Sequence, residues 1–142
     1  MNGLTTNTSP QLAWTIGELQ NLQGVDTAIV TTSDGLLITH SEAISRDQAD
    51  KLAAAVSGMY SLGRAASEFV HDRSLGQIGF EYEGAMILVT AVGHARNALI
   101  AATTLPGADT GVVGENMASM APSIARQLDV ADRSPSAGPT VR

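Results

Sequence analysis

One segment, residues 46–70, constrains the fold of this chain more than any other part of it. The segment contains no proline and follows Ser45, a favoured N-cap residue, and Gln48 three residues later completes a capping box. These features predict a helix from Arg46 to about Val70, which is long compared with the ~10–14 residues of an average globular helix. The fold must therefore provide cover for an unusually long helix.

Apolar and small side chains surround more than half of this predicted helix. A helix that lies on one sheet needs only a single apolar face. Here one line at helical spacing consists of Leu52, Val56, Met59, Gly63, Ala66 and Val70. A second line beside it consists of Ala55, Gly58, Leu62, Ala65 and Phe69. The small residues of the second line would also let the backbone of another helix approach closely.

Two arrangements would cover the second line. Another part of the same chain could pack against it, or two copies of the chain could pair through it in a homodimer with a self-complementary interface. The other two predicted helices, near the two ends of the chain, are both needed on the opposite face of the sheet. We therefore favour the homodimer.

The remaining sequence predicts two more helices and five strands. Ser9 and Pro10 suit the start of a helix that ends before Gly24. A last helix starts near Thr110, and we expect a kink or a break in it at Pro122. The strands are expected at residues 25–32, 36–40, 76–82, 85–92 and 98–104.

Tight turns join neighbouring strands, so the predicted sheet is antiparallel. The run from Ala85 to Val92 is apolar nearly throughout, which indicates a strand covered on both faces. The sequence thus predicts an α/β (α+β) sandwich with a five-stranded antiparallel sheet, the element order α-β-β-α-β-β-β-α, and helices on both faces. We expect one domain at residues 9–130, between a disordered N-terminus at 1–8 and a disordered C-terminal tail at 131–142.

Composition excludes several classes of function. The chain has no cysteine, which rules out a disulfide framework, a thiolate metal site and a cysteine nucleophile. Its eight basic residues are scattered and its formal net charge is −6, so we expect no nucleic-acid partner. The longest apolar run is about half of the ~20 residues that a membrane-spanning helix needs, and the N-terminus resembles no signal peptide. We expect a cytoplasmic protein without membrane insertion.

No motif in the sequence indicates catalysis. A phosphate-binding loop and a dinucleotide fingerprint are both missing. The three histidines, His40, His71 and His94, lie far apart in the sequence, and Ser33 with Asp34 is better explained as a turn than as part of a nucleophilic site. We therefore assign no catalytic, cofactor-binding or metal-binding residue and predict that the protein is not an enzyme.

The order of these elements and several local motifs resemble the Roadblock/LC7 family. The resemblance covers Leu12 to about Leu128. Its main marks are the passage Leu22-Gln23-Gly24-Val25-Asp26-Thr27-Ala28-Ile29-Val30, the turn Ser33-Asp34-Gly35-Leu36, the alanine-rich central helix, and the strands Ile87-Leu88-Val89-Thr90-Ala91 and Leu99-Ile100-Ala101. A familiar variant of the family has Pro-Gly where this chain has Gln23-Gly24.

The resemblance implies a mode of assembly and a function. Members of the family dimerise through the central helix and the third strand, which adds the strand from Gln77 to Tyr82 to the interface. The expected dimer interface then consists of Ala55, Gly58, Met59, Leu62, Ala65, Phe69, Gln77, Gly79 and Glu81. Family members are non-enzymatic adaptors or regulators of small Ras-like GTPases.

The alanine-rich, lysine-poor composition resembles that of actinobacterial proteins. Similar short proteins in these bacteria are encoded with a sensor histidine kinase and a small GTPase. Our leading hypothesis is a homodimeric scaffold, without a cofactor, that binds and regulates a small Ras-like GTPase in a complex with such a kinase. The GTPase-binding surface is not assigned. An arginine supplied to the GTPase would have to be Arg64, Arg73 or Arg96, and we interpret each of them as a solvated surface residue.

The alternative is a small-molecule-sensing domain, because PAS and GAF modules have sheets of similar layout and bind ligands between sheet and helices. Such a site needs a pocket with a few convergent polar groups. The predicted core strands offer mostly Ala, Val, Ile and Leu instead.

Overall fold

The computed structural model describes residues 10–93 and 97–132. The segments 1–8 and 133–142, for which we expect disorder, lie outside the described residues, and so do His94 and Arg96. Residues 131 and 132, which we assigned to the tail, belong to the last helix.

The elements follow the predicted order α-β-β-α-β-β-β-α. They are α1 (Pro10–Gln20), β1 (Val25–Thr32), β2 (Leu37–His40), α2 (Arg46–Ala65), the 3₁₀ helix η2 (Ala66–Val70), β3 (Gln77–Tyr82), β4 (Ala85–Val92), β5 (Ala98–Thr104) and α3 (Thr110–Asp132). The predicted long helix thus consists of α2 and a final tighter stretch, η2.

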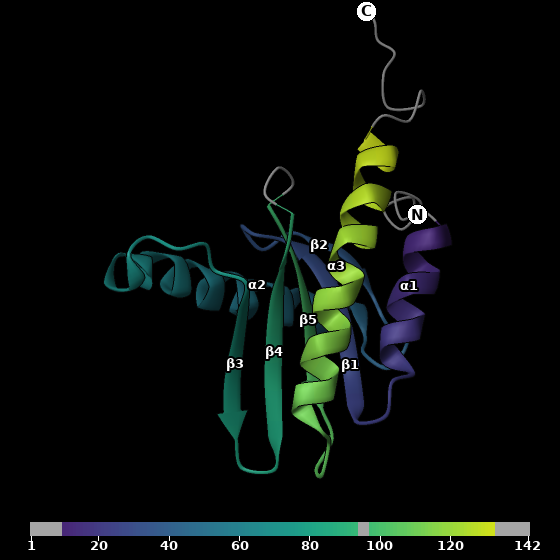
Figure 1. Cartoon of the computed structure of the whole chain (residues 1–142). Helices are drawn as coiled ribbons and strands as arrows, with labels where there is room; N and C mark the ends of the chain where they lie inside the picture. Colours follow the sequence, from purple (N-terminus) through teal and green to yellow (C-terminus); the bar gives the residue numbers. More distant parts are fainter. Residues whose placement is uncertain (1–9, 94–96, 133–142) are drawn as a thin grey trace, which may run out of the picture.

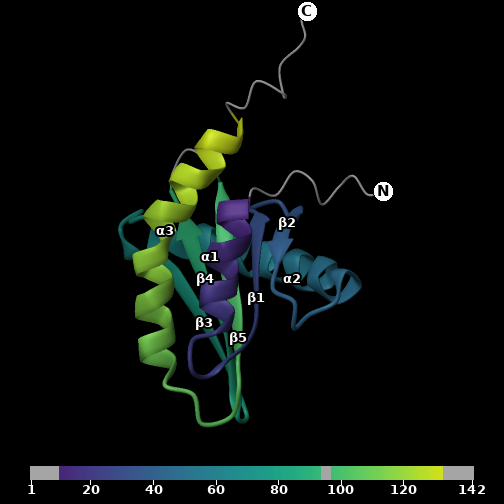
Figure 2. The same ribbon diagram turned by 90° about the vertical axis from the view of Figure 1, so that its right-hand side faces the viewer.

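The five strands form one antiparallel sheet in the order β2-β1-β5-β4-β3. Helices α1 and α3 cover one face of this sheet and α2 covers the other (Figure 1, Figure 2). The structure therefore confirms the predicted α+β sandwich, including the placement of the two terminal helices on one face.

Two layers of core residues hold the sandwich together. The layer between the sheet and α1 and α3 is the larger, and includes Leu19, Ile100 and Met117. The layer under α2 is narrower and includes Ile29, Val56 and Leu99. The middle strand β5 is buried along nearly its whole length because both layers cover it.

The strand β4 is less deeply buried than predicted at one end. Leu88, Val89, Thr90 and Val92 are buried, whereas Ala85, Met86 and Ile87 are only half-buried. The reason is that β4 pairs on its outer side with the exposed edge strand β3.

Side-chain hydrogen bonds cap the first turns of α2 and α3, and the cap of α2 is the predicted Ser45. The Ser45 Oγ accepts a hydrogen bond from the Gln48 amide at 3.1 Å, and the Asp109 Oδ1 accepts one from the Val112 amide at 3.2 Å. These are the bonds of N-cap residues. Helix α3 continues through Pro122 without a break.

The edge strand β3 is tied to α3 by one side chain. The Gln77 Nε2 donates hydrogen bonds to the Thr90 Oγ1 at 2.9 Å and to the Gly114 carbonyl at 3.0 Å. A Cβ at residue 114 would lie only 2.9 Å from the Gln77 Oε1, so glycine there allows this close approach. Gln77 therefore links β3 and β4 to the helix on that face.

We expect Gln77→Ala to lower the free energy of unfolding by about 1–3 kcal/mol, because two hydrogen bonds of about 0.5–1.5 kcal/mol each are lost. Urea unfolding at a fixed protein concentration measures the change. Glu81→Ala is the matched control, since Glu81 is exposed on the same face of the same strand. Equal stabilities of the two variants would contradict the assigned role of Gln77.

Candidate interaction surface

Helix α2 is longer than the sheet that it covers. Its first part lies over the sheet, and its last part together with η2 extends past the edge strand β3 (Figure 1). The crossing point is close to Gly63, where an added Cβ would lie 2.7 Å from the Leu75 Cδ2 and 3.3 Å from the Ile78 Cδ1. The side chains that follow Gly63 along the chain therefore extend beyond their own sheet.

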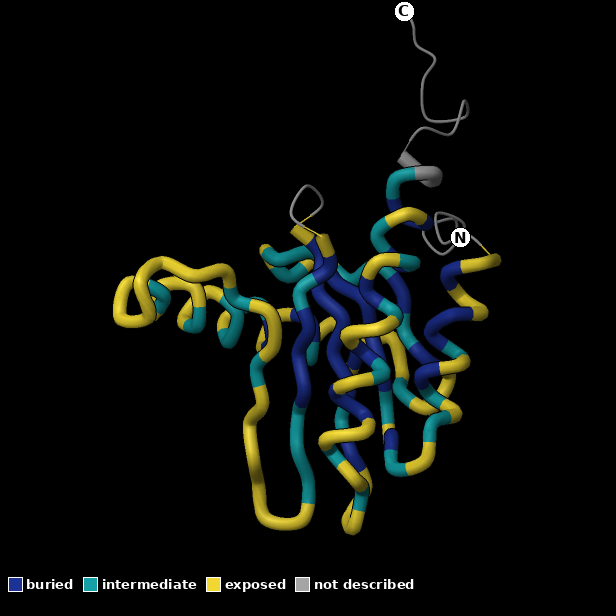
Figure 3. The backbone as a smooth tube through the Cα atoms, viewed as in Figure 1, coloured by how far each residue is buried: buried dark blue, intermediate teal, exposed yellow. Residues whose placement is uncertain are grey.

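This overhanging end exposes large apolar side chains, and most of its residues are coloured as exposed in Figure 3. Leu62 is 73% exposed, Phe69 80% and Val70 50%. Leucine and phenylalanine at such exposure, gathered on one element, are typical of a surface that another molecule covers.

The edge strand β3 adds two aromatic side chains. Ile78 packs against the core layer under α2. Because side chains alternate along a strand, Phe80 and Tyr82 lie on the same face as Ile78. They are 37% and 50% exposed. We define the α2–β3 surface as Leu62, Phe69, Val70, Phe80 and Tyr82, which are more than half of the exposed large hydrophobic residues in the described part of the chain.

The two edges of the sheet differ in a way that singles out β3. At the far edge, β2 has four residues and its register with β1 shifts between Val30 and Thr31. Short and irregular edge strands resist pairing with other chains. In contrast, β3 has six residues in unbroken register with β4 and contains no proline or lysine. Its outer edge is open to a further strand.

The structure places the predicted interface residues in three environments. On α2 and η2, the residues Ala55, Gly58, Leu62, Ala65 and Phe69 are all exposed, whereas Met59 is half-buried against the core layer. On β3, Gly79 and Glu81 are exposed but lie on the face that looks toward α3, and Gln77 is hydrogen-bonded there. That these residues form an interface stays a prediction.

Phe80 and Tyr82 were missing from the predicted set. The alternation of Ile78, Phe80 and Tyr82 in the sequence showed that they share a face. It did not show which face of β3 looks toward α2. The packing of Ile78 under α2 supplies that information.

Two of the residues considered for catalysis, Ser33 and His40, make hydrogen-bond contacts in the structure. The Ser33 carbonyl accepts a hydrogen bond from the Ser57 Oγ at 2.8 Å, which fixes the β1–β2 turn against α2. The His40 Nδ1 lies 2.8 Å from the Ser41 carbonyl. Residues 10–93 and 97–132 contain no group of three or more His, Cys, Asp or Glu placed to hold a metal ion.

No helix in these ranges is long and apolar enough to cross a membrane.

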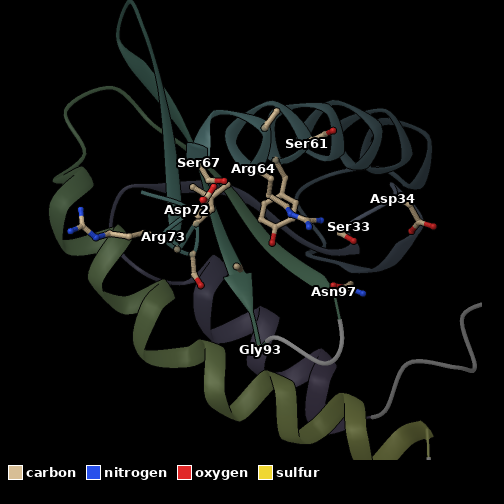
Figure 4. A pocket seen from close by; sticks show the side chains of 15 residues that line it. Ser33, Asp34, Ser61, Arg64, Ser67, Asp72, Arg73, Gly93 and Asn97 are labelled. Atoms are coloured by element: carbon tan, nitrogen blue, oxygen red, sulfur yellow. The ribbon is translucent and has the colours of Figure 1, made fainter. Parts of the chain in front are cut away.

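A polar hollow lies beside α2, at the end of the sheet where Ser33 and Asp34 of the β1–β2 turn lie near Gly93 and Asn97 (Figure 4). Its volume is about 940 Å³, and its lining includes Arg64, which lies over the Tyr60 ring at 5.8 Å from the ring centroid. The hollow is open to solvent along the helix. Its lining combines residues of α2 with Ala91 of β4 and with loop residues, and one of the lining residues, Tyr60, also packs against the core layer under α2.

Comparison with known proteins gives the family. The family model for the Roadblock/LC7 domain matches residues 13–104. A search of the curated proteins gives no match.

Solved structures agree with this match. The Roadblock/LC7 domain from Streptomyces avermitilis is 29% identical, with a TM-score of 0.76 over 83% of this chain and 98% of that one. The gliding protein MglB from Thermus thermophilus is 17% identical, with a TM-score of 0.69 over 92% and 94%. MglB from Myxococcus xanthus is 12% identical, with a TM-score of 0.75 over 85% and 97%. At these identities the two MglB structures show a shared fold. The matched segment spans most of the sandwich, from α1 to β5, and the chain therefore belongs to the Roadblock/LC7 domain family.

Proposed function

We propose that this protein is a non-enzymatic, homodimeric scaffold that binds a small Ras-like GTPase and regulates it in a bacterial signalling complex in the cytoplasm. The observation that carries the dimer is the exposed α2–β3 surface. Membership of the Roadblock/LC7 family supports the GTPase as partner. A sensor histidine kinase as a further member of the complex rests on the resemblance to actinobacterial proteins alone.

The proposed dimer follows from the open edge of β3. If β3 pairs antiparallel with β3 of a second copy, the two sheets become one and a two-fold axis passes between the two edge strands. Such an axis keeps equivalent faces of the two sheets on the same side. The two copies of α2 therefore lie on one face of the joined sheet.

This arrangement also covers the overhang. Each α2 crosses its own sheet near Ile78, at the start of β3. In an antiparallel pair, the start of one β3 lies beside the end of the other. The overhanging Phe69 of one copy then extends toward Phe80 and Tyr82 of the second copy. Both parts of the α2–β3 surface are covered by the same contact.

The energetics favour this contact. Full burial of a leucine or phenylalanine side chain contributes about 1.5–3 kcal/mol. The five side chains of each copy are 37–80% exposed, so each gains part of this value in the dimer, and strand pairing adds to it against the ~4–15 kcal/mol cost of association. The small residues Ala55, Gly58 and Ala65 lie on the outer side of α2, where they let the second copy approach closely.

We expect sedimentation velocity to show a dimer at micromolar concentration. Phe69→Asp places a charge in the proposed contact and removes the burial of one phenylalanine from each copy, two in the dimer, so the dimer should dissociate at least roughly 100-fold more readily. Leu36→Asp is the control, because Leu36 is also exposed (67%) but lies on the β1–β2 turn at the other side of the sheet. A wild-type monomer, or a Phe69→Asp dimer as tight as the wild type, would count against the dimer.

The partner is tested with the small Ras-like GTPases encoded by the same genome, each loaded with GDP or with a non-hydrolysable GTP analogue. We expect one of them to co-elute with the dimer in at least one nucleotide state, and its rate of hydrolysis or exchange to change. Absence of binding in both states for every GTPase would contradict the proposed function.

A further inference from the structure

The polar hollow beside α2 lies on the opposite flank of the helix from the proposed dimer contact. Tyr60 and Arg64 are one helical turn apart and line the hollow, and Ser57, on the same flank, bonds to the β1–β2 turn. Ala55 and Leu62 lie about half a turn away around the helix, on the other flank. In the dimer described above, the second α2 lies on the side of Ala55 and Leu62. Most of the hollow therefore stays open when two copies pair, although Ala65 both lines the hollow and belongs to the predicted dimer interface.

The hollow carries charges of both signs. Figure 4 shows Arg64 between Asp34 on one side and Asp72 on the other, with Arg73 beyond Asp72 and extending away from α2. Within residues 10–93 and 97–132, neither of these arginines forms an ion pair, whereas Arg46 on the same helix pairs with Asp50 at 3.2 Å. The Arg64 guanidinium stacks over the Tyr60 ring instead. Its hydrogen-bond donors therefore remain available to another molecule.

The rim of the hollow is held in a defined shape. Asp72 and Asn97, which line the hollow, have φ angles of 55° and 50°, and His71 next to Asp72 has one of 61°; non-glycine residues rarely adopt such angles. The Asp72 amide donates to the Ser67 carbonyl at 2.9 Å, and the Asn97 carbonyl accepts from the Ser33 amide at 2.6 Å. The first bond closes a local turn after α2, and the second joins two segments that are distant in the sequence, so both hold lining residues of the hollow in place.

We propose that this hollow is where the GTPase partner docks, with Arg64 binding a carboxylate of the GTPase. The inference rests on the proposed function. An arginine guanidinium and a carboxylate form paired hydrogen bonds of defined geometry. Tyrosine and arginine together are the side chains most enriched in the energetic centres of protein interfaces. Mixed charges around them would select the orientation of the partner.

The geometry also defines how Arg64 acts. A catalytic arginine that a regulator supplies to a GTPase must extend outward into the partner's active site. Arg64 instead lies in the wall of a concave surface, against Tyr60. Arg64 therefore stays in the wall of the hollow, and the GTPase supplies the carboxylate side chain that enters the hollow and binds it.

The experiment compares GTPase binding by wild-type protein, Arg64→Glu, Arg64→Lys and Arg46→Glu, by calorimetry at about 50 mM and 500 mM salt. Arg64→Glu should weaken binding roughly 30-fold or more, as expected when one partner of a hydrogen-bonded charge pair is lost. Arg64→Lys keeps the charge but loses the planar fork and should bind with intermediate affinity. Arg46→Glu is the matched control, an exposed arginine on the same helix, and should bind like the wild type.

Sedimentation velocity on each variant shows whether the dimer is intact, and Arg64→Gln replaces Arg64→Glu if the charge reversal impairs folding. Loss of binding by an intact dimeric Arg64 variant supports the proposal. Binding by Arg64→Glu as tight as that of the wild type overturns it and leaves the proposed function standing. A wild-type protein that binds no GTPase overturns both.

Discussion

The close packing of α2 on the sheet determines the arrangement of every surface discussed above. The side chains that α2 directs at the sheet include the small residues Ala49 and Ala53, which are fully buried, so the helix lies close to the strands. It also crosses the sheet and continues past β3 (Figure 1). The helix therefore has three different environments: the core on its inner side, an open flank toward the end of the sheet, and an overhang beyond the edge.

Much of this fold follows from the sequence. Proline-free spacing and a capping box predict α2 and η2, and tight turns predict the antiparallel pairing. Periodicity identifies which side chains share a face of a helix or strand, as for Ile78, Phe80 and Tyr82. It does not report how far a helix extends relative to a sheet edge. The overhang depends on where α2 crosses the strands, which is a property of tertiary packing.

Sequence patterns alone do not predict the polar hollow. Ser33, Arg64, Asp72 and Asn97 come from four segments that the topology brings together. Each of them taken alone resembles an ordinary surface or turn residue. The contact of Gln77 is equally hidden in the sequence. The family resemblance placed Gln77 in the interface, whereas in the structure its side chain donates a hydrogen bond to the Gly114 carbonyl of α3, a residue distant in the sequence. In the proposed assembly, the low content of charged residues, 15%, reflects a helix that is covered on more than one side.

The central claim is that the outer edge of β3 is covered by a second copy of the chain. Hydrogen–deuterium exchange of the β3 amides, measured over a range of protein concentrations, tests it most directly. Amides that point outward from an uncovered edge strand exchange rapidly, whereas those in a paired strand are protected. If two copies pair through β3, these outward β3 amides are protected at micromolar concentration and lose protection on dilution, while the β5 amides stay protected throughout. Rapid exchange of these β3 amides at every concentration would contradict it.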